Sequence, residues 1–238
     1  MKTLGLVGGT GWVSTVDYYR LINQGINEAL GGHEFARCIL YSLNFADIVA
    51  CNERNDTEGI YALVKDAADK VIQAGAEGIV LCANTLHKYV DRLQQTIRVP
   101  IVHIAEATAR EIHKKNLITI GLLGTKYTME EDFYTSKLAA ANIRTIVPEK
   151  VDREFINATI YNELLKEIFK EESKKRFLEI MQKLEQRGAQ GIVLGCTEIP
   201  LIIKDEDFHL PLFNTTAIHA RAAVNFALQP TAQPGQAS

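Results

Sequence analysis

The segment GAEGIVLCANT (75–85) recurs as GAQGIVLGCTE (188–198) in this chain of 238 residues. Two further pairs keep the same order: LGLVGGT (4–10) with IGLLGT (120–125) and, more faintly, PIVHIAEA (100–107) with PLFNTTAI (211–218). Because the three pairs share their order and have similar spacing, we interpret the chain as two related halves.

Short apolar, β-branched runs alternate with longer amphipathic segments along both halves. The short runs predict strands at 4–8, 38–43, 78–82, 118–124, 143–147 and 191–195. Apolar residues at i, i+3 and i+4 predict helices between them, among them 56–74, 104–115 and 215–228. Buried strands separated by helices are typical of parallel sheets. The predicted fold is α/β, with two pseudo-symmetric domains that each hold a mainly parallel sheet flanked by helices.

The repeat also suggests where the domains divide. We expect an N-terminal domain of residues 1–104 together with about 215–228, and a C-terminal domain of residues 105–214. Residues 229–238 are rich in Pro, Gln and Ser and lack periodicity, so a disordered tail is predicted there. Two such domains can face each other across a cleft, with the loops at the C-terminal ends of their strands lining it.

The composition excludes several classes of partner. The chain has 47% hydrophobic residues, 23% charged residues and a net charge of −3, with both signs mixed along it. Neither a nucleic-acid footprint nor a basic membrane patch is therefore predicted. No apolar stretch approaches the roughly 20 residues that span a bilayer, and the N-terminal residues lack a signal-peptide pattern. We expect a cytoplasmic protein without nucleic-acid or membrane partners.

Two of the four cysteines lie at matching places in the repeat. Cys82 and Cys196 each come just after a GIVL segment, whereas Cys38 and Cys51 have no counterpart and are predicted to serve in packing. No C-x-x-C spacing or disulfide framework is present, so free thiols and no metal site are expected. His87 and His219 do not form an H-x-x-x-H pair and are predicted to support a cysteine, to pack between helices or to lie at the surface.

A pair of thiols on opposing walls suits racemisation. One group removes the Cα hydrogen from one face of a substrate, and the other delivers a proton to the opposite face. Backbone N–H groups and the start of a helix after each strand stabilise a thiolate, so the pKa of Cys82 and Cys196 is expected to fall toward neutrality.

Several longer segments resemble the aspartate/glutamate racemase family of PLP-independent amino-acid racemases. They span about residues 2–228 and comprise LGLVGGTGWVSTVDYYRLIN (4–23), GAEGIVLCANTLHK (75–88), LLGTKYTMEEDFY (122–134), IYNELLKE (160–167), GAQGIVLGCTEIPL (188–201) and PLFNTTAIHA (211–220). The resemblance implies catalysis by Cys82 and Cys196 without a cofactor, an amino-acid substrate and a homodimer. It further implies that the substrate is held by Thr10, Asn52, Ala83, Asn84, Thr85, Thr125, Lys166 and Thr197.

Departures from the family pattern bear on the substrate. Many relatives read GGMSWEST where this chain has GGTGWVST (8–15), and Asn52 stands where an arginine or glutamine often reaches the substrate side chain, with Arg54 nearby. Glu167 replaces a common glycine after Lys166. Lys166 suits an acidic side chain, whereas the uncharged Asn52 weakens strict aspartate specificity, so a neutral polar substrate stays open.

Three other functions compete with the racemase interpretation. The turn GGTG (8–11) forms neither G-x-G-x-x-G nor G-K-[ST], which argues against a nucleotide-binding protein. A carboxylate-binding protein without catalysis would not need both cysteines. The third alternative is another two-cysteine enzyme of the superfamily, such as a hydantoin racemase, a decarboxylase or a cis–trans isomerase.

Overall fold

The computed structural model describes residues 1–230, so most of the tail predicted at 229–238 lies outside the described residues. The chain divides into two compact units. Unit 1 comprises Met1–Cys82, Tyr89–Val102 and the chain from Ala220 onward, and unit 2 comprises Ala83–Lys88 and His103–His219. The short segment directly after Cys82 thus belongs to unit 2, and the last helix begins in unit 2 and ends in unit 1.

Unit 1 is built on a parallel sheet of order β2-β1-β3. Its strands are β1 (Leu4–Gly8), β2 (Cys38–Ser42) and β3 (Gly78–Leu81), and a parallel bridge joins Ile79 to Ile101. Its helices are α1 (Trp12–Leu30), α2 (Phe45–Glu53), α3 (Thr57–Gln73), α4 (Val90–Gln94) and the later part of α11 (Thr215–Leu228).

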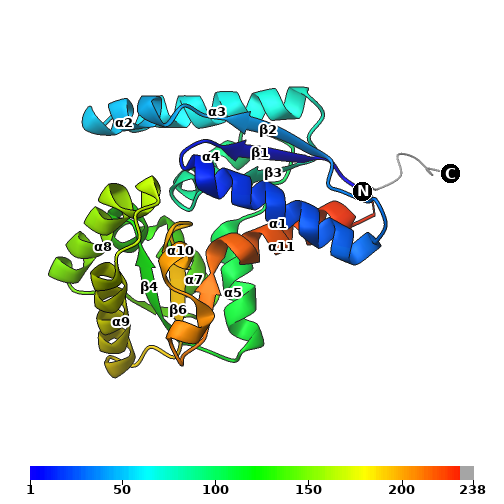
Figure 1. Cartoon of the computed structure of the whole chain (residues 1–238). Helices are drawn as coiled ribbons and strands as arrows, with labels where there is room; N and C mark the ends of the chain where they lie inside the picture. The colour runs from blue at the N-terminus through cyan, green and yellow to red at the C-terminus, as the bar shows by residue number, and fades with distance from the viewer. Residues whose placement is uncertain (231–238) are drawn as a thin grey trace. The chain divides into compact units, whose positions relative to one another are not determined.

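The alternation of side chains along β1 explains how helices cover both faces of this sheet (Figure 1). Leu4 and Leu6 pack in one cluster with α1 and α11. A Cβ at the intervening Gly5 would instead meet Val71 of α3, at 2.7 Å. Since successive residues of a strand point to opposite faces, α3 lies on one face while α1 and α11 lie on the other.

Unit 2 contains a four-stranded parallel sheet of order β5-β4-β6-β7. The strands are β4 (Thr119–Gly124), β5 (Arg144–Ile146), β6 (Ile192–Gly195) and β7 (Leu212–Asn214). The α-helices that belong wholly to it are α5 (Ile104–Lys114), α6 (Lys126–Glu130), α7 (Asp132–Ala140), α8 (Lys150–Asn162), α9 (Glu171–Gln186) and α10 (Ile199–Ile202). Three 3₁₀ turns complete it: η2 (Leu164–Lys166), η3 (Asp205–Asp207) and η1 (Thr85–Tyr89), whose last residue belongs to unit 1.

The two sheets have the same strand order. In each, the first strand of the unit lies between the second and the third, and the fourth position beside the third is taken by Ile101 in unit 1 and by β7 in unit 2. The repeated segments therefore occupy equivalent places. The predicted α/β fold with two parallel sheets flanked by helices is confirmed.

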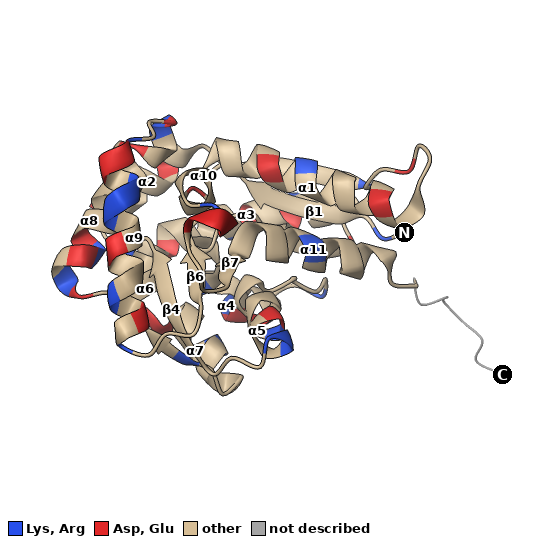
Figure 2. Ribbon diagram, turned by 60° about the horizontal axis from the view of Figure 1, so that its bottom comes forward, with Lys and Arg blue, Asp and Glu red and all other residues tan. Residues whose placement is uncertain are grey.

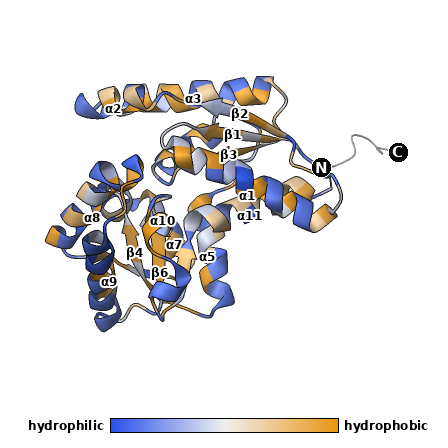
Figure 3. Ribbon diagram, viewed as in Figure 1, coloured by the Kyte–Doolittle hydropathy of each residue, from blue (hydrophilic) through white to orange (hydrophobic). Residues whose placement is uncertain are grey.

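Polar and apolar residues separate as a layered α/β fold requires. Arg144 at the start of β5 is the one charged residue in the strands of residues 1–230, and the other charges of this part lie on helices and loops (Figure 2). The strands are largely apolar, whereas α9 is mainly hydrophilic apart from the stripe of residues that it buries (Figure 3). That stripe, which includes Phe177, Ile180 and Leu184, packs into the core of unit 2.

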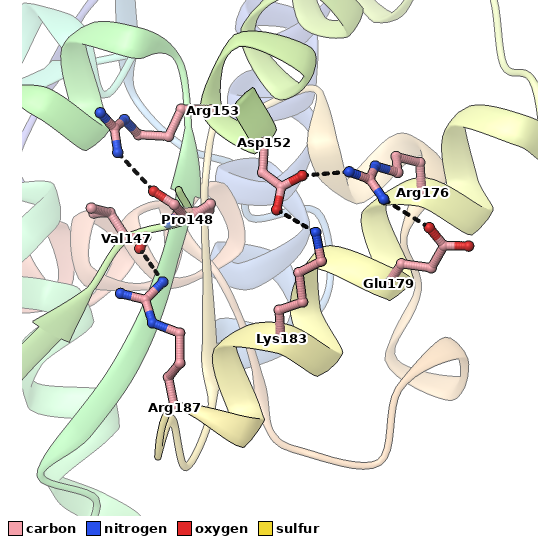
Figure 4. A network of polar contacts seen from close by, with 8 residues as sticks. All are labelled: Val147, Pro148, Asp152, Arg153, Arg176, Glu179, Lys183 and Arg187. Carbon is pink, nitrogen blue, oxygen red and sulfur yellow. Dashed lines mark hydrogen bonds and ion pairs between the residues drawn. The ribbon is translucent and has the colours of Figure 1, made fainter. Parts of the chain in front are cut away.

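One buried carboxylate joins α8 to α9 (Figure 4). Asp152, whose side chain is 4% exposed, accepts from Arg176 Nη2 at 2.6 Å and from Lys183 Nζ at 2.8 Å. Arg187 of the loop after α9 also donates to the carbonyl of Val147, which precedes α8. Two cations compensate the buried charge, so the contact fixes the two helices that lead into and out of the segment carrying Lys166.

Candidate functional site

In unit 1, the turn after β1 holds Thr10. Gly9 has φ of +91°, and a Cβ there would collide with the backbone of Leu43, so this tight turn requires glycine. Gly9 N–H donates to Thr15 Oγ1 at 2.9 Å, which anchors the turn to α1. The Thr10 hydroxyl oxygen is buried without a hydrogen-bond partner. Buried polar atoms are normally satisfied, so this hydroxyl is suited to meet a ligand.

Cys82 lies directly after β3, at the same edge of the sheet as this turn. Its N–H donates to Val7 O at 2.8 Å, and its Sγ contacts Val80 O at 3.6 Å. The side chain is 1% exposed and belongs to the cluster formed with α1 and α11. Burial, with a smaller contribution from Cys38, raises the pKa of the Cys82 thiol far above its ordinary value.

Unit 2 brings Cys196, Thr197 and Thr125 to the C-terminal edge of its sheet, directly after β6 and β4. Thr125 caps α6 and its hydroxyl lies 3.3 Å from that of Thr128. A Cβ at Gly195 would lie 2.7 Å from the carbonyl oxygen of Leu123, so the residue before Cys196 must be small for β6 to approach β4.

Cys196 differs from Cys82 in its partner. Cys196 Sγ donates to Glu198 Oε2 at 2.8 Å, and Thr197 Oγ1 donates to the same oxygen at 2.8 Å. Burial raises the pKa of the Cys196 thiol well above its ordinary value, and Glu198 raises it further. The backbone N–H groups of Thr197 and Glu198 lower the pKa of Cys196, as expected for N–H groups of the turn that follows a strand.

The expected fall of both thiol pKa values is therefore wrong. The N–H groups invoked from the sequence are present at Cys196, but the desolvation of a buried sulfur outweighs them. Sequence reasoning located the strand ends and did not foresee how completely each sulfur would be removed from water.

The turn after Cys82 is held by a buried hydrogen-bond chain within unit 2. Asn84 Nδ2 donates to Thr215 Oγ1 at 3.1 Å, and that hydroxyl donates to Leu194 O at 2.9 Å. Leu194 lies in β6, two residues before Cys196. These hydrogen bonds therefore link the segment that follows Cys82 to the strand that precedes Cys196.

Other buried polar groups surround this turn. His87 Nδ1 donates to Ala83 O at 3.0 Å, since the carbonyl can only accept. The ring of His87 lies 5.0 Å from that of His103 and 5.2 Å from that of His219, centroid to centroid. Asn84 Oδ1 is buried without a hydrogen-bond partner, as is the hydroxyl of Thr216. The two histidines singled out from the sequence thus pack together, and acceptor and hydroxyl groups remain for a ligand.

Lys166 ends η2 and is exposed, and no described carboxylate forms an ion pair with it. The next residue, Glu167, has φ of +56°, a left-handed conformation that glycine adopts more easily. Glu163 accepts from Ser173 and Lys170, which lowers its pKa and ties the turn to α9.

Asn52 lies near the end of α2 in unit 1 and is half-buried. The neighbouring Arg54 places Nη2 3.8 Å from Cys51 Sγ and 4.0 Å from Asp56 Oδ2. Arg54 is thus engaged within its own turn, and the roles of Asn52 and of the other predicted binding residues stay predictions.

Sequence reasoning missed three residues near Cys196: Glu198, Tyr161 and Thr215. Burial, followed by the proximity of Cys196, Tyr127 and Glu198, raises the pKa of Tyr161 to about 12. Glu198 was visible as a carboxylate two positions after Cys196, whereas Tyr161 and Thr215 are far from it in the sequence and become neighbours of β6 only in the fold.

Residues 1–230 contain neither a candidate metal site nor a candidate membrane span. Their His, Cys, Asp and Glu side chains form no group of three or more suited to a metal ion. Within the same residues, no helix combines the length and the apolar character needed to cross a bilayer.

Comparisons with known proteins place the chain among racemases. The family model for the Asp/Glu/Hydantoin racemase matches residues 7–223. The crystal structure of a Yersinia pestis protein provisionally assigned as an Asp/Glu racemase is 45% identical, with a TM-score of 0.91 over 96% of this chain and 100% of that one. An aspartate racemase homologue from Pyrococcus horikoshii OT3 is 35% identical, with a TM-score of 0.84 over 95% and 99%.

A relative at lower identity is the broad specificity amino-acid racemase RacX of Bacillus subtilis (strain 168). It is 23% identical over 171 residues, which make up 71% of this chain and 73% of the relative. These similarities agree with the resemblance inferred from the repeated segments. The chain belongs to the Asp/Glu/Hydantoin racemase family.

Proposed function

We propose that this protein is a cofactor-independent amino-acid racemase in which Cys82 and Cys196 work on opposite faces of one substrate carbon. The observation that carries the proposal is the equivalent place of the two thiols. Each is a buried free cysteine, and each directly follows the third strand of a sheet with the same strand order. Free thiols at such strand ends are the acid–base pair that a two-base racemisation requires.

The reaction needs one thiolate and one thiol. The thiolate takes the Cα proton, and the thiol then gives its own proton to the opposite face, so the two sulfurs exchange roles with each turnover. Burial makes a thiolate costly, but the ammonium group of a bound amino acid supplies a nearby positive charge that favours it. Substrate binding is thus proposed to activate the pair.

The proposed binding groups are hydroxyls, amides and backbone N–H groups. Thr10, Asn84, Thr85, Thr125 and Thr197, with the Ala83 backbone, would hold the carboxylate and the ammonium group of the substrate. Lys166 and Asn52 would meet its side chain. The partly neutral character of these side-chain contacts, together with the similarity to a broad-specificity racemase, supports a substrate range that extends beyond aspartate and glutamate.

The proposal is tested in D2O without added PLP, where NMR measures the loss of the Cα–H signal for each amino acid and for a hydantoin. The wild type should exchange Cα–H and racemise at least one amino acid. Cys82→Ser and Cys196→Ser should each lower racemisation by roughly 10²–10⁴-fold, while each variant retains slow exchange for one enantiomer.

Cys51→Ser is the matched control, because Cys51 is also buried but lies in α2. It should keep full activity. Undiminished racemisation in either strand-end variant contradicts the two-base scheme. The homodimer and the cytoplasmic location expected from the sequence stay predictions, which sedimentation and cell fractionation would test.

A further inference from the structure

The carboxylate of Glu198 is buried beside Cys196. The residue is 5% exposed, and its Oε2 accepts from both the thiol of Cys196 and the hydroxyl of Thr197, each at 2.8 Å. Cys82 has no such neighbour, because its Sγ faces the carbonyl of Val80. A carbonyl oxygen accepts a hydrogen bond but does not take up a proton near neutral pH, whereas a carboxylate does.

Glu198 has no cation to compensate its charge among the ion pairs formed by residues 1–230. Tyr161 of α8 is a further titratable group near Glu198, and a tyrosine carries no positive charge. The other buried acid, Asp152, is by contrast paired with two cations. A buried carboxylate held only by a thiol and a hydroxyl is costly for the fold, which points to a role in chemistry.

We propose that Cys196 and Glu198 share one proton, and that Glu198 takes this proton when Cys196 becomes a thiolate. This inference rests on the proposed racemase function for its role in turnover. In the step, the S–H bond breaks, its electron pair stays on sulfur, and the proton forms an O–H bond at Glu198 Oε2. The pair carries one negative charge before and after the step.

This conservation of charge explains how a cysteine that is buried away from water can act as a base. Burial opposes the creation of a charge, but moving a charge over 2.8 Å within the same buried pair creates none. The N–H groups of Thr197 and Glu198 favour the thiolate once it forms. Glu198 is therefore a positioning residue that acts through Cys196, and the two strand-end thiols are chemically unequal.

The direct test is the titration of Cys196 by NMR in protein labelled with ¹³Cβ-cysteine. Its resonance is assigned by its loss in Cys196→Ser. Glu198→Gln keeps the shape of the side chain and removes both the charge and the proton acceptor. We expect the Cys196 pKa to lie about 1–3 pH units lower in this variant, because a neighbouring negative charge no longer opposes the thiolate.

The kinetic readout is the pH profile of kcat/KM. In the wild type the pair gains its negative charge when the carboxyl group of Glu198 ionises. In Glu198→Gln only the thiol can ionise, and its pKa, although lower than in the wild type, lies above that of a carboxyl group. The acidic limb should therefore move to higher pH, and kcat/KM near neutral pH should fall roughly 10²–10⁴-fold. The fall must be equal for both enantiomers because the equilibrium constant of racemisation is 1. Glu198→Asp, whose carboxylate is one methylene shorter, should give intermediate values and serves if the glutamine variant does not fold.

Glu172→Gln, an exposed acid on α9, is the matched control and should change neither readout. An unchanged Cys196 pKa, or an acidic limb that does not move in Glu198→Gln, overturns the shared proton. If the wild type racemises no substrate, the proposed function fails instead, and the NMR titration alone still decides whether the two residues share a proton.

Discussion

Unit 1 and unit 2 have the same strand order but bury different chemistry. Among the described residues, the buried polar side chains of unit 1 are Ser14 and Thr15. Those of unit 2 are two acids, three histidines, seven threonines, one serine and one asparagine. Apolar burial is therefore sufficient to specify this topology. The polar groups of unit 2 are an addition to the fold, which is why they are the better guide to function.

The two strand-end cysteines show the same contrast. In unit 1, Val7 pairs with Leu81, so the next residue of each strand sets Cys82 opposite Gly8. In unit 2, Gly124 is the equivalent of Gly8 and pairs with Gly195, so Cys196 lies one residue further along. Because side chains alternate, this offset turns Cys82 toward α1 and α11 of unit 1 and Cys196 toward α8 and α9 of unit 2. The repeat preserves the backbone and not the surroundings of the sulfur.

The largest effect on stability is expected from the buried charge of unit 2. Asp152→Asn leaves Lys183 without a carboxylate and Arg176 with Glu179 alone, and should lower the free energy of unfolding by about 3 kcal/mol, since both cations keep some contact with water. Asp66→Asn in unit 1 breaks the exposed pair with Lys70 and should change the free energy of unfolding far less, because water screens an exposed pair. Urea unfolding measures both.

Hydrogen exchange sharpens this first comparison. In Asp152→Asn the amides of α8 and α9 should lose protection before those of β1, because the lost contact lies between these two helices. Equal costs for the two substitutions would mean that the charge networks of the units do not differ in energy.

A smaller effect is expected from the hydroxyl that links the two cysteine-bearing segments. Thr215→Val keeps the shape of the side chain but leaves Asn84 Nδ2 and Leu194 O without their partner, at a cost of about 2 kcal/mol. If Asn84 holds substrate, KM should rise several-fold while the Cys196 pKa stays unchanged. Thr215→Ser retains the hydroxyl and should restore KM, and a variant with wild-type KM and stability would remove Thr215 from the site.

The smallest effect concerns Cys38, which begins β2, where unit 2 has Arg144 at the start of β5. Burial raises the pKa of Cys38 from 9.0 to about 11. Between these values the unfolded chain loses the proton and the folded chain keeps it, so stability falls as pH rises.

Cys38→Ala should therefore reduce the loss of unfolding free energy between about pH 8 and about pH 10.5 by about 1 kcal/mol, a value lessened by the partial exposure of the thiol. Urea unfolding at the two pH values measures it. A variant with the same alkaline loss as the wild type would show that Cys38 titrates normally in the folded protein.

Much of the fold was predictable because its signals are local. Six of the strands lie within one residue of the ranges predicted from apolar runs, and α11 begins and ends at the predicted residues. The short β7 and the bridge at Ile101 were visible only as a faint sequence pair, since few residues form them. Local periodicity reports burial on a strand or helix, and it weakens with length.

By itself, the sequence determined the duplicated α/β topology, the two cysteines at matching strand ends and the membership of a racemase family. Each of these depends on residues close together in the chain. Only the tertiary structure decided that both thiols are buried, that Glu198 accepts a hydrogen bond from Cys196, and that Thr215 joins Asn84 to β6. A thiol pKa depends on desolvation and on charges brought near by packing, and these follow from positions in space.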